Sequence, residues 1–150
     1  MLGTPTEVVN GGVTTQVGGD HTLGGGNALF SATNSSAGTD DVDGGTCILA
    51  SPTWNVADPS TLSVWYFHGQ RDAGDDPGGD FFSLEVSTNG GGTFSSLVSL
   101  GDGVSEAAWA HATTAIPAGS NVQLRVQVAD GATVGDLIEG GIDDVSICPQ

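Results

Sequence analysis

Acidic side chains gather in four glycine-rich stretches of this 150-residue sequence, and their chemistry is that of a hard-cation site. Calcium takes about six to eight oxygen ligands from carboxylates, carbonyls and water, and glycine-rich loops let carbonyl groups turn toward an ion. The stretches contain Asp20; Asp40, Asp41 and Asp43; Asp72, Asp75, Asp76 and Asp80; and Asp136, Glu139, Asp143 and Asp144. We predict a calcium site whose ligands come from Asp20, Asp41, Asp43, Asp72, Asp80, Asp143, Asp144 and Glu139.

The acidic loops also have a plainer explanation, because Asp favours turns and a solvated turn needs no ion. Neither Asp-rich loop is an EF-hand. The twelfth position counted from Asp41 is Pro52, and counted from Asp72 it is Ser83, where that motif needs a bidentate Glu. The three histidines form no close pair and there are two cysteines, which argues against a transition metal.

Within the stretch 140–148, residues 142–147 are predicted to form the last strand, with Val145 and Ile147 on its inward face. Asp143 has the same parity as these two residues, so the alternation places its carboxylate at the end of an inward-facing row. A buried carboxylate is costly unless it is paired or binds a cation. Because the chain has two strong bases against 18 acids, a bound metal is the interpretation that we favour for Asp143.

The charge balance restricts the partners of this chain. Fourteen Asp and four Glu face two Arg and no Lys, which leaves a net charge of -16. Such a chain has nothing to neutralise phosphates, so nucleic acid is excluded as a partner, and binding to anionic membranes is disfavoured. No apolar run approaches transmembrane length. The length suits one domain with a real core.

Cys47 and Cys148 are the two cysteines, and we predict a disulfide between them that ties the last strand to the first third of the chain. One bridge in a chain rich in Gly, Thr and Ser fits an exported, extracellular or cell-surface protein. The alternative is two buried free thiols in a cytosolic protein. The first residues lack the basic start and apolar run of a signal peptide, so we interpret Met1 as an artificial start or a processed end.

Short alternating segments separated by glycine-rich turns dominate the chain, and no stretch has sustained helical periodicity. Residues 121–129 alternate most cleanly, and residues 61–68 are apolar on both faces, as expected of a central strand. The predicted fold class is all-β, an antiparallel β-sandwich of jelly-roll type. We expect residues 1–18 to be an N-terminal extended segment and residues 19–150 to form the sandwich.

Catalysis has little support in this sequence. It contains no Gly-x-Ser-x-Gly, His-Glu-x-x-His or phosphate-loop motif. A glycosidase pair among Glu85, Glu106 and Glu139 is expected by chance in so acidic a chain. We therefore predict that the protein is not an enzyme. Trp54 and Trp109 are candidates for stacking on sugars, whereas Trp65 lies in an apolar segment and is expected in the core.

An ordered set of motifs resembles the MAM-like jelly-roll modules attached to secreted bacterial peptidases and surface proteins. The resemblance covers roughly residues 19–148, and it implies a non-catalytic, calcium-stabilised domain whose role depends on the rest of the protein. The hairpin at residues 87–94 also resembles an Asp-box, with Asn89 and Phe94 in place of the usual Asp and Trp, and that motif implies no activity. The motifs are Gly19-Asp20-His21-Thr22, Asp41-Val42-Asp43-Gly44-Gly45-Thr46, Leu49-x-Ser51-Pro52, Trp65-Tyr66, Ser87-x-Asn89-Gly90-Gly91-x-Thr93-Phe94 and Ile142-Asp143-Asp144-Val145-Ser146-Ile147.

Three functions follow as hypotheses. The first is an extracellular calcium-binding module for stabilisation, adhesion or targeting within a larger protein. The second is a self-assembling subunit of a filament or surface layer. There, residues 1–17 pair with a sheet edge of another copy, because their β-prone segments 7–9 and 13–17 need an edge, their own or a neighbour's. The third is a carbohydrate-binding module.

Overall fold

The structure is a computed structural model that describes residues 1–22, 24–32, 36–72, 76, 78–131 and 136–150. Twelve strands and no helix form among these residues, so this part of the chain offers no helix able to cross a membrane. In chain order the strands are β1 (Leu2–Gly3), β2 (Val8–Asn10), β3 (Val13–Gln16), β4 (Ala28–Phe30), β5 (Gly45–Ala50), β6 (Trp54–Val56), β7 (Ser60–Gln70), β8 (Phe81–Ser87), β9 (Ser95–Leu100), β10 (Ala110–Ile116), β11 (Ser120–Asp130) and β12 (Ile138–Pro149).

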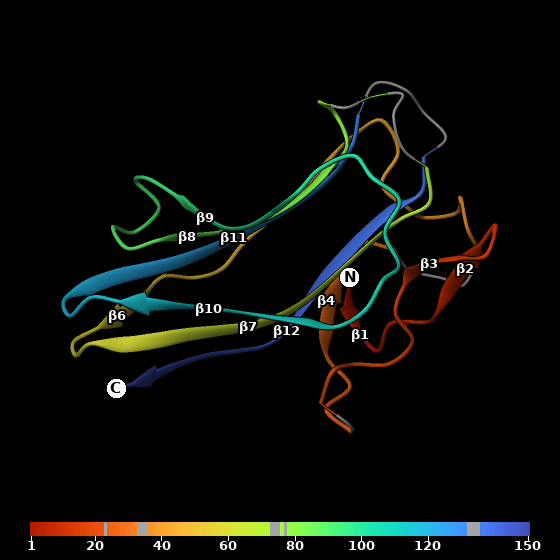
Figure 1. Ribbon diagram of the computed structural model, residues 1–150. Coiled ribbons are helices and arrows are strands. Elements are labelled where there is room, and N and C mark those ends of the chain that lie inside the picture. The colour runs from red at the N-terminus through yellow and green to blue at the C-terminus, as the bar shows by residue number, and fades with distance from the viewer. Residues whose placement is uncertain (23, 33–35, 73–75, 77, 132–135) are drawn as a thin grey trace.

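Two antiparallel sheets face each other. The first has the order β1-β4-β12-β7-β10, and the second has the order β5-β11-β8-β9, with β6 pairing the other end of β11. Figure 1 shows β8, β9 and β11 in one layer and β7, β10 and β12 in the other. The predicted fold class, an antiparallel β-sandwich of jelly-roll type, is confirmed.

The core between the sheets follows from strict alternation in β8 and β11. Phe82 and Leu84 of β8 are fully buried, as is Val122 of β11, and their polar neighbours along the strands lie on the outer face. The register pairs Phe82 with Val128, so the two inward rows lie side by side. Burial of each such side chain stabilises the fold by about 1.5–3 kcal/mol, which is why these two strands form the centre of the second sheet.

Strand β12 passes between aromatic rings on both of its faces, and two glycines make this passage possible. A Cβ atom on Gly140 would lie 2.6 Å from the Phe82 ring inside the sandwich. A Cβ atom on Gly141 would lie 2.4 Å from the Phe67 ring on the outer face. Both distances are far shorter than ordinary contacts, so the close packing of β12 depends on the absence of side chains here.

A β-bulge in β12 corrects the predicted orientation of Asp143. The register against β7 shifts between Asp143 and Ser146, and Asp144 has a left-handed φ of 46°. The extra residue reverses the parity of the strand. Ile147 still faces the core, but Asp143 lies opposite Trp65 on the outer face of the sheet. The prediction that Asp143 continues the inward row of Ile147 is therefore wrong.

Residues 1–17 are paired and packed within their own chain. Strand β1 pairs with β4, and the β2–β3 hairpin lies against the outer face of the first sheet. A Cβ atom on Gly69 of β7 would lie 2.4 Å from the backbone oxygen of Thr15, so this contact is made backbone to backbone. Val17, Phe67 and Trp109 belong to a second, smaller apolar cluster under this cover.

Cys47 and Cys148 are both free and exposed, so the predicted disulfide is wrong. Cys47 lies in β5 and lines a hollow together with Ile142 of β12. Cys148 is six residues beyond Ile142 in the same strand β12, about 20 Å along it at about 3.3 Å per residue. A disulfide requires Cα atoms within about 7 Å of each other. The two thiols therefore lie toward opposite ends of the sandwich.

Candidate functional site

Three buried carboxylates meet at the end of the sandwich where β8 begins and β11 ends. Oxygen atoms of Asp80, Asp130 and Asp136 all lie within 4.8 Å of one another. Asp80 and Asp130 continue the inward rows of Phe82 and Val128, so alternation alone turns both side chains inward. Asp136 enters from the segment that leads into β12. We name these three residues the acidic cluster.

Hydrogen bonds position Asp80 within this cluster. The Gly131 N–H donates to Asp80 Oδ1 at 2.9 Å, and the Gln70 side chain donates to Asp80 Oδ2 at 3.3 Å. The same Gln70 amide also donates to Asp102 at 3.2 Å. A fourth acid, Asp76, lies next to Gly131, where a Cβ atom would be 2.1 Å from its carboxylate oxygen. The loop therefore has no room for a larger residue at position 131.

Asp130 carries the clearest electrostatic conflict in the cluster. It is fully buried, and its carboxylate oxygens have no side-chain partner; the backbone N–H of Gly44 is the one group that partly offsets the rise in its pKa. Burial and the negative charges of Asp80, Asp43 and Asp41 raise its pKa to about 6. A buried carboxylate without a side-chain partner is unfavourable in the charged form, which is the form that binds a metal ion.

Glu139 is a second buried carboxyl group whose pKa is raised. Its pKa rises to about 8, chiefly because of burial, with smaller contributions from Asp41 and Asp43. The Ser31 hydroxyl donates to the Glu139 carboxylate and partly offsets the rise. The pKa values of Asp130 and Glu139 are thus both raised in part by Asp41 and Asp43.

The two arginines are engaged with other groups. Arg125 binds Glu85 at 2.6 Å on the outer face of the second sheet and lies 4.1 Å from the centre of the Phe94 ring. Arg71 donates to Asp72 at 2.6 Å and to Asn10, and the charge of Asp136 also contributes to the raised pKa of Arg71. The candidate ligands of the acidic cluster are three carboxylates, a donor set suited to a hard divalent cation such as calcium.

The eight predicted metal ligands separate into two groups. Asp80 belongs to the acidic cluster, and the charges of Asp41 and Asp43 raise the pKa of Asp130 there; the same two acids raise the pKa of Glu139. The other four have different partners: Asp20 accepts from the Gly26 N–H, Asp72 binds Arg71, Asp143 accepts from the His21 N–H, and Asp144 binds the His21 ring. Asp75 lies outside the described residues.

Asp130 was missed as a candidate ligand, although the sequence contains a signal for it. It follows Val122, Leu124, Val126 and Val128 at the same parity, at the end of the most regular strand. We expected Asp143 to continue an inward-facing row of its strand. It is Asp130 that does so. Asp136 has no such signal, because it lies outside the strands and comes close to Asp80 and Asp130 only in the folded chain.

An aromatic stack occupies the outer face of the first sheet. The rings of His21 and His111 both stack on Trp65, with centroid distances of 3.7 Å and 4.7 Å. The His21 ring nitrogen lies 2.7 Å from Asp144 Oδ2, and bonds from His21 and Thr22 lower the pKa of Asp144. Trp65 therefore lies on the outer face, not in the core between the sheets as expected.

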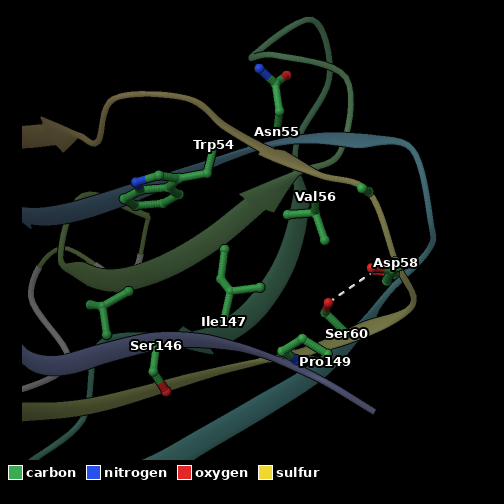
Figure 2. Close-up of a pocket in the computed structure, with 10 residues that line it drawn as sticks. Trp54, Asn55, Val56, Asp58, Ser60, Ser146, Ile147 and Pro149 are labelled. Carbon is green, nitrogen blue, oxygen red and sulfur yellow. Dashed lines mark hydrogen bonds between the residues drawn. The ribbon is translucent and has the colours of Figure 1, made fainter.

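Trp54 and Trp109, the predicted sugar-stacking residues, lie on different parts of the molecule. Trp109 packs edge-on against Phe67 at 5.2 Å in the second apolar cluster. Trp54 belongs to β6 and lines a groove of about 470 Å³ between β6 and the end of β12. Figure 2 shows Trp54 and Ile147 pointing into this groove from its two sides. The two tryptophans form no common platform.

Comparison with known proteins supports the fold. No family model and no curated protein sequence matches this chain. It is similar to the K3 cleaved adhesin domain of Lys-gingipain from Porphyromonas gingivalis W83, with a TM-score of 0.54 and 14% identity over 100% of this chain and 98% of that chain.

Two further solved structures are similar. The K1 cleaved adhesin domain of the same protein has a TM-score of 0.50 and 14% identity over 83% of this chain and 75% of that chain. A family 16 carbohydrate-binding module has a TM-score of 0.42 and 11% identity over 84% and 79%. At these identities the two adhesin domains show a shared β-sandwich fold.

Proposed function

We propose that this chain is a non-catalytic adhesion module that works outside the cell and is stabilised by calcium at its acidic cluster. One observation carries the proposal: Asp130 is fully buried beside Asp80 and Asp136, and no positively charged side chain is bonded to it among the described residues. Folding that leaves such a group unsatisfied is unfavourable, and a divalent cation removes the conflict.

Calcium at this position would act as a clamp rather than as a reagent. Asp80 precedes β8, Asp130 ends β11, and Asp136 precedes β12, so one ion would hold the ends of three strands from both sheets. The ion's charge would also offset the repulsion that Asp41 and Asp43 exert on Asp130. Because a preformed site rarely exists in the unfolded chain, the binding free energy becomes folding free energy.

The adhesive role rests on the fold and on the motifs. The similar solved structures include two domains described as cleaved adhesin domains, and the ordered motifs resemble MAM-like modules of surface proteins. The self-assembling subunit has less support, because residues 1–17 pair within their own chain. The carbohydrate-binding module also has less support, because Trp54 and Trp109 lie apart.

Isothermal titration calorimetry with calcium chloride tests the metal proposal. We expect binding by the wild-type protein, and loss of that binding in Asp130→Asn, which keeps the shape of the side chain but removes its charge. Asp58→Asn is the matched control, because Asp58 is exposed and lies at the other end of the sandwich. Equal binding by all three proteins, or binding by none, would overturn the calcium site.

A further inference from the structure

The groove beside Trp54 lies between two sheet edges that have no strand pairing on one side. Strand β4 pairs with β12 only at Gly141 and Ile142. Among the described residues, the segment 144–149 of β12 has β7 on one side and no strand on the other. Strand β6 likewise pairs only with β11. An unpaired edge leaves backbone N–H and C=O groups available to another extended segment.

The floor of the groove is apolar and continues along the open side of the sandwich. Figure 2 shows Trp54 and Ile147 directed into it, whereas Asn55 and Ser146 point away, as expected for alternating strands. A second hollow, of about 260 Å³, shares Trp54 and Val145 with the first and extends to Leu49. Val145 is 39% exposed and Leu49 is 38% exposed, so this apolar strip faces solvent.

Negative charge lies at one end of the apolar strip. Asp58 lines the groove at the end of β6 and is exposed, whereas the Asp144 carboxylate is bonded to the His21 ring and to Thr22. Six residues of open edge span about 20 Å. The surface thus offers edge hydrogen bonds, apolar contacts and the negative charge of Asp58, on a molecule whose net charge is -16.

From this arrangement we infer that the groove binds an extended, positively charged segment of a partner protein, which adds as a strand to residues 144–149. Alternate apolar side chains of that segment fill the space against Trp54 and Ile147. A Lys or Arg of that segment pairs with Asp58, and the net negative charge of the protein favours further basic residues beside it. A second copy of this chain is the wrong occupant, because two molecules of net charge -16 repel each other.

The inference names the kind of partner for the adhesive function proposed above, and it is independent of calcium. Asn121 lies opposite β6, and Asp130 is nine residues further along β11, which separates the groove from the acidic cluster by about 30 Å. The two proposals can therefore be tested separately: peptide binding can be observed without calcium binding, and calcium binding can be observed without peptide binding.

The probe is a fluorescent synthetic peptide with two Lys at each end and three Val alternating with Thr between them. We expect it to bind at physiological ionic strength in a fluorescence anisotropy titration. Val145→Lys places a cation on the open edge and should weaken binding by about tenfold or more. Val104→Lys is the matched control: Val104 is also an exposed valine, 61% exposed, but it lies in a loop that does not line the groove.

Two further peptides separate the contributions. One replaces every Lys by Glu, and the other replaces the central Val and Thr residues by Gly and Ser. We expect neither to bind. Equal binding of the Gly/Ser peptide, or equal weakening by Val145→Lys and Val104→Lys, would show only general charge attraction and overturn the groove. Binding of the Glu peptide would overturn the cationic partner, as would a Val145-dependent dimer in sedimentation velocity.

Discussion

Asp80 and Asp130 lie opposite each other across neighbouring strands, one step beyond the pair Phe81–Ala129 in the register of β8 and β11. Like charges directly opposite in a sheet are destabilising. Here the pair is also buried, and Asp136 joins it within 4.8 Å. The regular pairing of β8 with β11 thus brings buried carboxylates of like charge together.

Calcium should raise the melting temperature of the protein. At a free calcium concentration about 100 times Kd the gain in unfolding free energy is about 2.7 kcal/mol, which corresponds to roughly 5–10 °C for a domain of this size. The measurement is differential scanning calorimetry in excess calcium and in excess EDTA. Asp130→Asn should abolish the difference and Asp58→Asn should keep it. An unchanged wild-type curve contradicts the clamp.

The stability of the metal-free protein should fall as the pH rises toward 8. Burial raises the pKa of Glu139 to about 8 from its ordinary 4.5, so between these values the folded state holds a proton that the unfolded state has lost. The stabilising contribution is complete below the lower pKa and is lost as the pH passes the higher one. Urea denaturation in EDTA between pH 6.5 and 8 measures this slope.

The matched variants for this slope are Glu139→Gln and Glu7→Gln. The Gln at position 139 stays neutral at every pH, so we expect a shallower fall in unfolding free energy. Glu7 is exposed and its replacement should leave the slope unchanged. A slope that Glu139→Gln does not alter would assign the pH dependence to general repulsion among the acids.

Gly69→Ala should destabilise the fold by about 1–3 kcal/mol, because the new methyl group would collide with the backbone of Thr15. The loss reports on the packing of the N-terminal hairpin against its own β7. Gly101→Ala is the control, since nothing lies within 4 Å of a Cβ atom there. Thermal unfolding compares the two. Equal melting temperatures would mean that residues 1–17 leave β7 in solution.

Both cysteines should remain free thiols in the folded monomer. Cys47 and Cys148 are exposed and lie toward opposite ends of the sandwich, beyond the reach of a disulfide. We expect two added alkyl groups by intact-mass spectrometry after reductant is removed and iodoacetamide is added to the native protein. Recovery of unmodified monomer that becomes alkylated only after reduction would restore the disulfide that the sequence suggested.

The alternation of side chains determined the sandwich before any tertiary information. The sequence predicts the inward rows of β8 and β11, because residues two apart in a strand face the same side of the sheet. The same rule places Asp80 and Asp130 inward, so two members of the acidic cluster were within reach of sequence reasoning. The net charge of -16 likewise argues against a nucleic-acid partner from the sequence alone.

Only the tertiary structure decided which rows meet and where alternation breaks. The bulge at Asp144 reverses the alternation of side chains in β12 and places Asp143 on the outer face opposite Trp65. The residue pattern of this strand does not predict the bulge. Parity is local to a strand, whereas register, bulges and the separation of Cys47 from Cys148 depend on partners distant in the chain. The arrival of Asp136 beside Asp80 and the open edge along Val145 have the same origin, since both result from how complete strands pack against each other.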